Sequence, residues 1–378
     1  MMSVLPEWDV VTCPSTGRSV AHQAKEKPLR TDLRQVAERS GVSVSTASRA
    51  LAGSTVVSSS TRLRVEEAAR ALAYRPNASA RTLRTTRSRL IGLVITNLVN
   101  SSLRVIAEIV QQRFDAAGYQ LVLCISGGDA EQESRALRTL MDLDVCGVVA
   151  VGSNNTAFAE LRAGAIPVIH LGRRPTRLVG DCVLGDEAGG AAAATRHLLE
   201  NGHRRIAIIC GPASITSGRE RLRGYQQALR AAGLVFSDRL VVSGPLVADT
   251  GSAAVDSLLG LPRSRRPTGL VVANSEAVQG VLPRLGELKV TVPQQLSIVC
   301  YEDAPITAWW HPPISVIDSQ PASMAELVAR LLLEQVADSK ATARKPTVYR
   351  IATRLVERSS VGPPPRHHAT PMPVAGTA

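Results

Sequence analysis

The pattern of apolar and polar positions divides the 378-residue chain into two differently built parts. From Leu90 to Tyr301, short continuous apolar runs alternate with stretches that repeat apolar residues every three or four positions. The runs are typical of buried strands, and the periodic stretches are typical of amphipathic helices. Such an alternation predicts parallel sheets joined by right-handed crossovers, and the number of strands favours two lobes over one sheet.

The elements expected in this part can be placed by residue number. We predict strands at 90–95, 120–125, 146–151, 167–171, 182–185, 205–210, 239–242, 269–273 and 296–301. We predict helices at 104–117, 130–142, 155–163, 188–200, 218–232, 252–259 and 276–288. The fold class of this part is therefore α/β, with doubly wound parallel sheets.

Residues 29–74 carry an all-helical pattern instead. Asp32 is a good cap for a first helix that begins at Leu33, and Gly41 allows a tight turn after it. Ser43 can cap a second helix from about Val44 to Ala52. A third helix, capped by Ser58, is expected from about residue 59 to residue 73.

The second of these helices has a small inner face and a polar outer face. Ala47, Ala50 and Leu51 can face inward. The residues left outside are Val44, Ser45, Thr46, Ser48 and Arg49. Hydroxyls and one arginine on the outer face suit a helix that lies in a DNA major groove.

Basic residues concentrate around the same helices. Between Leu29 and Arg89, 12 arginines and no lysine face 4 acidic residues, a net charge of +8 out of the chain's +12. From Leu90 to the end the charges nearly balance. The expected partner of the basic segment is a phosphate backbone.

Signals for other function classes are weak. The six cysteines are scattered without a C-x-x-C pair, which indicates buried thiols in a reducing cytoplasm and no metal site. No apolar run approaches the roughly 20 residues of a membrane span, and the first 28 residues do not look like a secretory signal. No nucleophile elbow, Walker loop or H-E-x-x-H motif is present, so we expect neither an enzyme nor a cofactor.

Longer motifs carry a family resemblance. Asp-Leu-Arg-Gln-Val-Ala (32–37), Gly-Val-Ser-Val-Ser-Thr-Ala-Ser-Arg-Ala-Leu (41–51) and Tyr-Arg-Pro-Asn-Ala-Ser-Ala-Arg-Thr-Leu (74–83) occur in order. Together they resemble the headpiece of the lactose/galactose repressor (LacI/GalR) family of bacterial transcriptional regulators. Gly-His-Arg-Arg-Ile-Ala-Ile-Ile-Cys-Gly-Pro (202–212) and Ser-Ile-Val-Cys-Tyr-Glu-Asp (297–303) resemble the family's core. The resemblance covers about residues 30 to 360.

The resemblance implies a domain organisation. A helix-turn-helix headpiece and a hinge helix precede a two-lobed core of the periplasmic-binding-protein type. We expect a disordered arm over 1–28, the DNA-binding domain over 29–74, the hinge helix and linker over 75–89, the effector-binding and dimerisation domain over 90–360, and a disordered tail over 361–378. Lobe 1 is expected at about 90–186 and 318–345, and lobe 2 at about 187–317, with crossings near Asp186, residues 280–293 and Ile317.

The same resemblance implies a function. The chain is expected to be a sequence-specific, DNA-binding transcriptional regulator in the cytoplasm, acting as a repressor. Its partners would be a pseudo-palindromic operator, a second copy of the chain in a homodimer, and a small-molecule effector between the lobes. A carbohydrate or carbohydrate derivative is the expected effector, and no membrane is involved.

The DNA-binding residues are carried over position by position. Val44, Ser45 and Arg49 match positions that reach base edges, where an arginine can hold a guanine with two hydrogen bonds. The expected phosphate contacts are Thr46, Ser48, Ser58, Thr61 and Asn77. Ala80, Arg81 and Leu83 match the hinge helix, with Leu83 as the wedge in the minor groove.

The effector residues are carried over in the same way, with departures. Arg221 matches the arginine that grips hydroxyls or a carboxylate, and Asn274 and Glu302 end two strands, with Glu302 where an aspartate is usual. Arg173 leaves room for a phosphorylated or acidic effector. Glu187 stands where asparagine is common, and Ser275 stands where aspartate is usual.

Three alternatives remain open at this point. The departures keep open a DNA-binding regulator that has lost its response to an effector. A periplasmic-type sugar-binding protein shares the core fold but predicts a signal peptide where this chain has a helix-turn-helix. An enzyme on a doubly wound sheet would need a catalytic constellation, and the sequence presents none.

Overall fold

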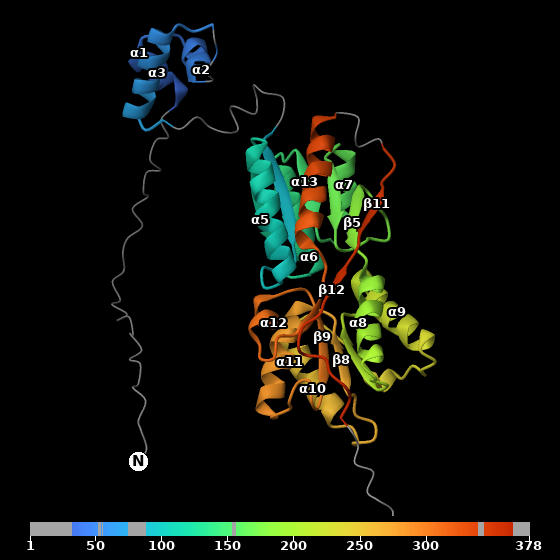
Figure 1. Ribbon diagram of the computed structural model, residues 1–378. Helices are drawn as coiled ribbons and strands as arrows, with labels where there is room; N and C mark the ends of the chain where they lie inside the picture. The colour runs from blue at the N-terminus through green and yellow to red at the C-terminus, as the bar shows by residue number, and fades with distance from the viewer. Residues whose placement is uncertain are drawn as a thin grey trace, which may run out of the picture. The chain divides into compact units, whose positions relative to one another are not determined.

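The computed structural model describes residues 32–51, 54, 56–74, 88–152, 156–338 and 344–365 (Figure 1). The chain forms two compact units, Met1–Thr86 and Arg87–Ala378. The first is the all-helical headpiece, and the second is an α/β unit of two lobes, each built on a six-stranded sheet. The expected fold class, a helical headpiece before two wound sheets, is confirmed.

The headpiece consists of three helices around a small apolar core. They are α1 (Leu33–Ser40), α2 (Val44–Leu51) and α3 (Ser59–Ala71). Val36, Ala47 and Val65 are fully buried where the three helices meet. Small residues at these positions allow short helices to pack closely, and this packing fixes which face of α2 points outward.

The caps predicted from the sequence are present. The carboxylate of Asp32 accepts hydrogen bonds from the backbone of α1, and Gln35 Oε1 accepts one from the Asp32 backbone N–H at 3.1 Å. Gly41 adopts φ 67°, the left-handed conformation that glycine tolerates, and ends α1. Ser43 Oγ accepts from Thr46 N at 3.1 Å, and Ser58 caps α3.

Lobe 1 is a sheet with helices on both faces. Its strand order is β11-β5-β4-β3-β1-β2, all parallel. The strands are β1 (Leu90–Ile95), β2 (Gln120–Ile125), β3 (Gly147–Ala150), β4 (Val168–Leu171), β5 (Asp181–Gly185) and β11 (Val348–Ile351). One face packs on α5 (Ser101–Ala116) and α13 (Pro321–Ala337), the other on α6 (Ala130–Asp142) and α7 (Ala157–Ala163).

Lobe 2 repeats this plan. Its strand order is β12-β10-β9-β8-β6-β7, and β12 is antiparallel to β10. The strands are β6 (Ile206–Cys210), β7 (Val241–Ser243), β8 (Gly269–Val272), β9 (Ser297–Tyr301), β10 (Ser315–Asp318) and β12 (Arg354–Val356). The helices are α8 (Glu187–Glu200), α9 (Thr216–Ala231), η1 (Asp238–Leu240), α10 (Ala248–Leu259), α11 (Ser275–Glu287) and α12 (Pro305–Trp309).

The predicted strands and helices up to Tyr301 are present, with shifted ends. The expected strand at 239–242 is divided between η1 and β7. After Tyr301 the structure adds α12, β10, α13, β11 and β12, which were not placed by the sequence analysis.

The chain passes between the lobes three times, and one passage differs from the prediction. The passages lie at Asp186 between β5 and α8, between β10 and α13, and between β11 and β12. The expected passage at 280–293 was wrong, because α11 and the loop after it stay in lobe 2. The third passage instead uses residues 352 and 353, since β11 joins the lobe 1 sheet and β12 the lobe 2 sheet.

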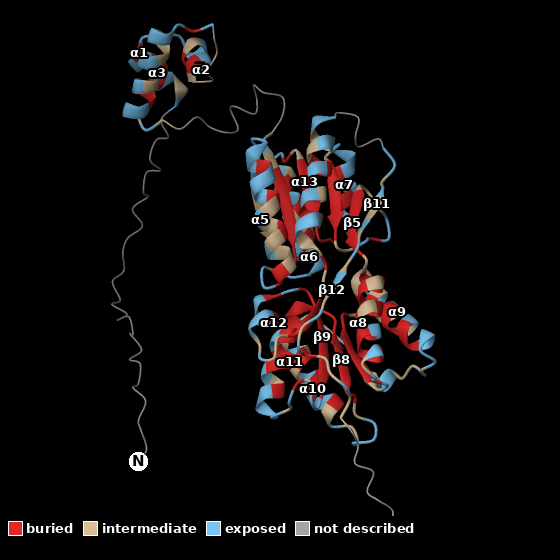
Figure 2. Cartoon of the chain, viewed as in Figure 1, coloured by how far each residue is buried: buried red, intermediate tan, exposed pale blue. Residues whose placement is uncertain are grey.

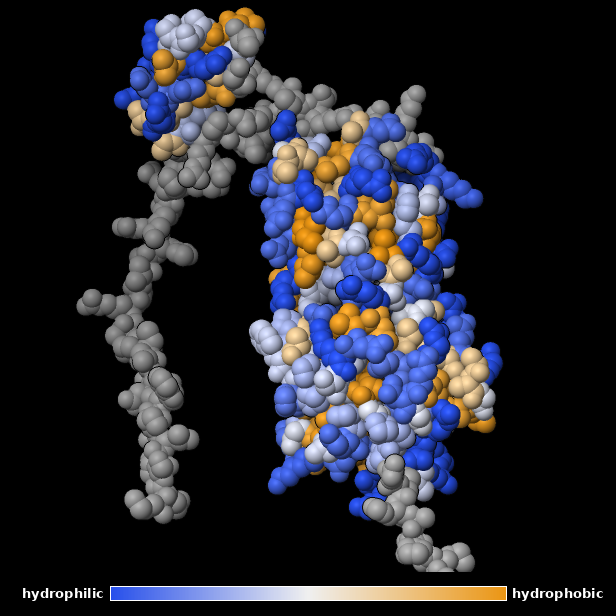
Figure 3. All heavy atoms as spheres, in the orientation of Figure 1, coloured by the Kyte–Doolittle hydropathy of each residue, from blue (hydrophilic) through white to orange (hydrophobic). Residues whose placement is uncertain are grey.

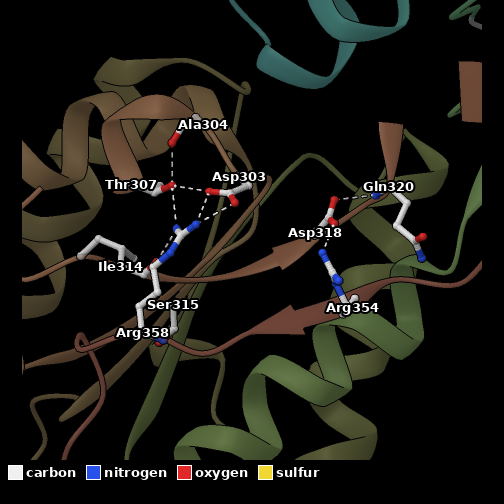
Figure 4. A network of polar contacts seen from close by, with 9 residues as sticks. All are labelled: Asp303, Ala304, Thr307, Ile314, Ser315, Asp318, Gln320, Arg354 and Arg358. Atoms are coloured by element: carbon white, nitrogen blue, oxygen red, sulfur yellow. Dashed lines mark hydrogen bonds and ion pairs between the residues drawn. The ribbon is translucent and has the colours of Figure 1, made fainter. Parts of the chain in front are cut away.

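Ion pairs anchor the last passages (Figure 4). Arg354 on β12 donates to Asp318 at the end of β10 at 3.2 Å. Arg358 donates to both carboxylate oxygens of Asp303, at 2.8 and 2.7 Å, and to the Ile314 carbonyl. These contacts hold the C-terminal segment against lobe 2.

The central strands of both sheets are buried between helices whose outer faces are exposed (Figure 2). Because only 3% of residues are aromatic, the cores consist mainly of valine, leucine, isoleucine and alanine. The visible surface of the lobes mixes hydrophilic and hydrophobic residues (Figure 3). Within the described part of the chain, no helix combines the length and apolarity needed to cross a membrane.

Candidate DNA-binding and effector sites

The outer face of α2 presents the side chains that the sequence predicted. Val44, Ser45 and Arg49 are exposed, while Thr46 and Ser48 are half-buried. Ala47 and Ala50, at 0% and 1% exposure, lie on the opposite face. The Arg49 side chain has no hydrogen bond or ion pair with any described residue, so its guanidinium is available to a partner molecule.

The hydroxyls near the start of α3 already have partners within the headpiece. Ser58 Oγ accepts from Thr61 N at 3.3 Å and donates to Thr61 Oγ1 at 2.9 Å. Ser58 therefore caps α3, and a phosphate contact by either residue stays a prediction. Asn77, Ala80, Arg81 and Leu83 lie outside the described residues, as do the expected arm and most of the expected hinge and tail.

Two of the predicted effector residues meet at the carboxyl ends of β8 and β9. Asn274 caps α11 by accepting from Ala277 N at 3.0 Å, and it donates to Glu276 Oε2 at 3.1 Å. Glu302 follows β9 with φ 66° and is 7% exposed. Its carboxylate accepts from the hydroxyl of Ser275, which places both chain segments in one polar cluster. Strand ends of this kind are where wound α/β sheets bind ligands.

Lobe 1 completes this cluster with a residue that the sequence reasoning missed. Asn100 caps α5 by accepting from Leu103 N at 2.9 Å. Its Nδ2 reaches across to lobe 2, at 3.2 Å from Glu276 Oε2 and 3.0 Å from Glu302 Oε2. Asn100 caps the helix after β1 as Asn274 caps the helix after β8, and a capping asparagine between a parallel strand and its helix is a signal that could have identified it.

Carboxylates crowd this cluster. Burial raises the pKa of Glu302, the Glu276 carboxylate adds to the rise, and Arg221 opposes it. Both effects disfavour a second negative charge in a site shielded from water.

Arg221 lies in the same region but is held by the protein itself. Its Nε donates to Glu187 Oε2 at 2.6 Å, and its Nη1 donates to the Ala273 carbonyl. Its guanidinium carbon lies 4.3 Å from the centre of the Tyr301 ring. Burial acts to lower the pKa of Arg221, but the Glu187 carboxylate raises it above its usual value, so the side chain stays charged. The expected arginine is therefore present, with a carboxylate partner from α8.

Arg173, after β4, belongs to the same electrostatic environment. Burial lowers its pKa, Glu133 and Glu276 act to raise it, and Arg221 acts to lower it. The structure thus gathers the four predicted effector residues, together with Asn100, Glu187 and Glu276, where the lobes face each other. Among the residues described, no group of His, Cys, Asp and Glu side chains could hold a metal ion.

Comparisons with known proteins cover both the headpiece and the two-lobed unit. Residues 32–77 match the family described as bacterial regulatory proteins, lacI family, and residues 195–361 match a periplasmic binding protein-like domain. The ribose operon repressor of Escherichia coli (strain K12) is 30% identical over 307 residues, which cover 80% of this chain and 92% of that protein. The HTH-type transcriptional repressor PurR of Aliivibrio fischeri (strain MJ11) is 29% identical over 332 residues, with 87% and 98% coverage.

Solved structures show the same architecture. A transcriptional regulator CelR–cellobiose complex is similar with a TM-score of 0.66 and 29% identity, covering 88% of this chain and all of that one. The lac repressor dimer bound to operator and the anti-inducer ONPF has a TM-score of 0.74 and 24% identity, with 88% and 99% coverage.

Proposed function

The chain belongs to the lacI family of bacterial regulatory proteins, and we propose that its α2 surface reads an operator whose affinity is set by a small molecule bound between the lobes. It is a DNA-binding transcriptional regulator and not an enzyme, and its relatives are transcriptional repressors. We place the protein in the cytoplasm. There it would bind its DNA as a homodimer.

The observation that carries the DNA-binding part is the outer face of α2. Arg49 projects from this face without a partner among the described residues, beside the exposed Val44 and Ser45. A guanidinium can bind a guanine edge with two hydrogen bonds, while valine offers apolar contact to a thymine methyl group. We assign base reading to these three residues.

The remaining DNA contacts are assigned by position. Thr46, Ser48, Ser58, Thr61 and Asn77 would contact phosphates. Ala80, Arg81 and Leu83, in the segment 75–89, would enter the minor groove, where Leu83 would separate a base step. Two headpieces in a homodimer would then read a pseudo-palindrome.

The cluster between the lobes supports the effector part. Amide and carboxylate groups of Asn274 and Glu302 can hydrogen-bond the hydroxyls of a carbohydrate or carbohydrate derivative. Arg221 from lobe 2 and Arg173 from lobe 1 would act as further donors. Because Asn100 bridges to lobe 2 within this cluster, a ligand here would change how the lobes are held together.

Selection of sites by the full chain from a pool of random duplexes, at fixed near-physiological salt, tests the proposal. We expect a pseudo-palindrome with a deformable central step from the wild-type chain, and relaxed preference in each half-site from Arg49→Ala. Arg104, on the outer side of α5, offers a control, because Arg104→Ala should recover the wild-type consensus. Recovery of no consensus by the wild-type chain would reject sequence-specific reading.

A further inference from the structure

We propose that the effector is a small hydroxylated molecule with a protonated amino group, and that carboxylated and phosphorylated molecules are excluded from the site. This inference rests on the proposed function, because it concerns the ligand of the same cluster between the lobes. Two features carry it: the charge of Arg221 is already compensated, and the donors that hydrogen-bond two buried carboxylates are all neutral within the described residues.

Arg221 is not a free anion receptor. Its Nε donates a hydrogen bond to Glu187 Oε2 at 2.6 Å, and its Nη1 donates one to the Ala273 carbonyl. Both side chains are almost fully buried, at 8% and 10% exposure, so the attraction between them is weakly screened by water. A ligand carboxylate would have to approach the guanidinium beside the Glu187 carboxylate. The attraction of the ligand carboxylate to Arg221 would be offset by its repulsion from the Glu187 carboxylate. A neutral hydroxyl would meet no such repulsion.

Glu276 and Glu302 lack a cation of their own. Neither forms an ion pair within the described residues, and their hydrogen bonds come from Asn97, Asn100, Asn274 and Ser275, which are neutral. Both glutamates are 7% exposed, so water can solvate them little. Buried carboxylates without a cationic partner are costly, and a bound cation would remove that cost.

The donors to these two carboxylates are neutral, and two of them are shared between both groups. Asn100 Nδ2 carries two hydrogens, yet it lies 3.0 to 3.3 Å from four carboxylate oxygens of Glu276 and Glu302. The Ser275 hydroxyl adds one hydrogen for the same two carboxylates, and the amides of Asn97 and Asn274 donate to Glu276. A primary ammonium group supplies three donors and a positive charge together, whereas a hydroxyl supplies one donor and no charge.

The wider charge balance points the same way. Arg173 is the group that could favour an anion, since no described residue forms an ion pair or hydrogen bond with its guanidinium. Carboxylates outnumber guanidinium groups around it, however. The side chains that interact electrostatically here are Glu133, Glu187, Glu276 and Glu302 against Arg173 and Arg221. This balance favours a cationic ligand over an anionic one.

The test uses matched probes on the full chain. D-glucose, D-glucosamine and D-glucose 6-phosphate form one set, and D-galactose, D-galactosamine and D-galacturonate form another. Thermal shift at neutral pH and fixed ionic strength, followed by calorimetric titration, gives the affinity of each. We expect an aminated member to bind about tenfold or more tightly than its neutral parent, as a charge-assisted hydrogen bond would give. The anionic members should not stabilise the protein.

Variants tie the preference to the named carboxylates. Glu276→Gln and Glu302→Gln keep the shape of the site but should reduce the ratio of amine to parent affinity. Glu187→Gln should leave Arg221 with an uncompensated charge and let an anionic member bind. Glu326→Gln, on α13 in an exposed ion pair with Arg113 of α5, is the control and should leave the ratio unchanged.

Three results would overturn the inference. The first is that a neutral parent binds as tightly as its aminated member, or more tightly. The second is that an anionic member binds to the wild-type chain. The third is that no aminated member binds at millimolar concentration. Under the first two, the proposed effector site would survive with a different ligand class. The operator selection described above judges DNA reading independently of all three.

Discussion

Removal of Arg221 should destabilise the protein, because it leaves the Glu187 carboxylate buried without its partner. The two groups are 2.6 Å apart, with side chains 8% and 10% exposed. Breaking a buried ion pair by removing one member typically costs about 3–5 kcal/mol. Arg221→Ala also leaves the Ala273 carbonyl without this donor and removes the stacking on Tyr301. We therefore expect the free energy of unfolding to fall by about 3–5 kcal/mol.

Urea unfolding followed by tryptophan fluorescence measures this loss. Trp310 packs against the apolar core of lobe 2, the lobe that contains Arg221, so its emission reports the unfolding of that lobe. The control is Arg113→Ala, because the ion pair between Arg113 and Glu326 is exposed to water and should contribute little.

A second variant separates charge from packing. Glu187→Gln combined with Arg221→Met removes both charges and keeps much of the volume, and it should recover most of the stability lost in Arg221→Ala. If Arg221→Ala unfolded at the same urea concentration as Arg113→Ala, the buried pair would not exist in solution. The reasoning about Glu187 as the built-in counter-ion would then fail.

Three further predictions follow from single residues. Arg49→Ala should weaken operator binding by about 1–3 kcal/mol in fluorescence anisotropy titrations while sparing random DNA; equal losses on both would make Arg49 a phosphate contact. His170 is fully buried with both ring nitrogens unpaired among the described residues, and burial lowers its pKa to about 4. The unfolded chain, with a histidine pKa of about 6.5, binds this proton first, so stability should fall by up to about 3 kcal/mol as pH drops from about 6.5 to about 4. His170→Leu should flatten that part of the stability profile, and an unchanged slope would contradict the assignment. Ser58→Ala removes the cap of α3 and should cost the headpiece about 1 kcal/mol in thermal unfolding; an unchanged midpoint would show that the cap contributes nothing.

Local features of the sequence predicted local structure well. Asp32, Gly41 and Ser58 act within three or four residues of their own position, so their caps and turn could be read from spacing alone. Passages between the lobes could not be read in this way. Which sheet receives β11 or β12 depends on strands more than a hundred residues away, for example the pairing of Val348 with Cys182.

The candidate site shows the same division. Asn274 and Glu302 were predicted from their place in family motifs and lie together in the structure. The bridge from Asn100 to Glu276 joins residues 176 positions apart, and no sequence period connects them. The pairing of Glu187 with Arg221 was missed for the same reason, although Glu187 stood out in the sequence as a departure from the family pattern.

The central claim is that a ligand between the lobes controls operator affinity, and one titration tests it most directly. The dissociation constant of the full chain for its selected operator would be measured with and without a saturating amount of the probe that stabilises the protein most. Couplings between sites are typically 5–150-fold, so we predict a change of at least about fivefold. Asn274→Ala, which removes a side chain from the cluster, should lose that change at the same probe concentration. An unchanged dissociation constant, with the probe bound, would contradict the account and favour a DNA-binding regulator without an effector response.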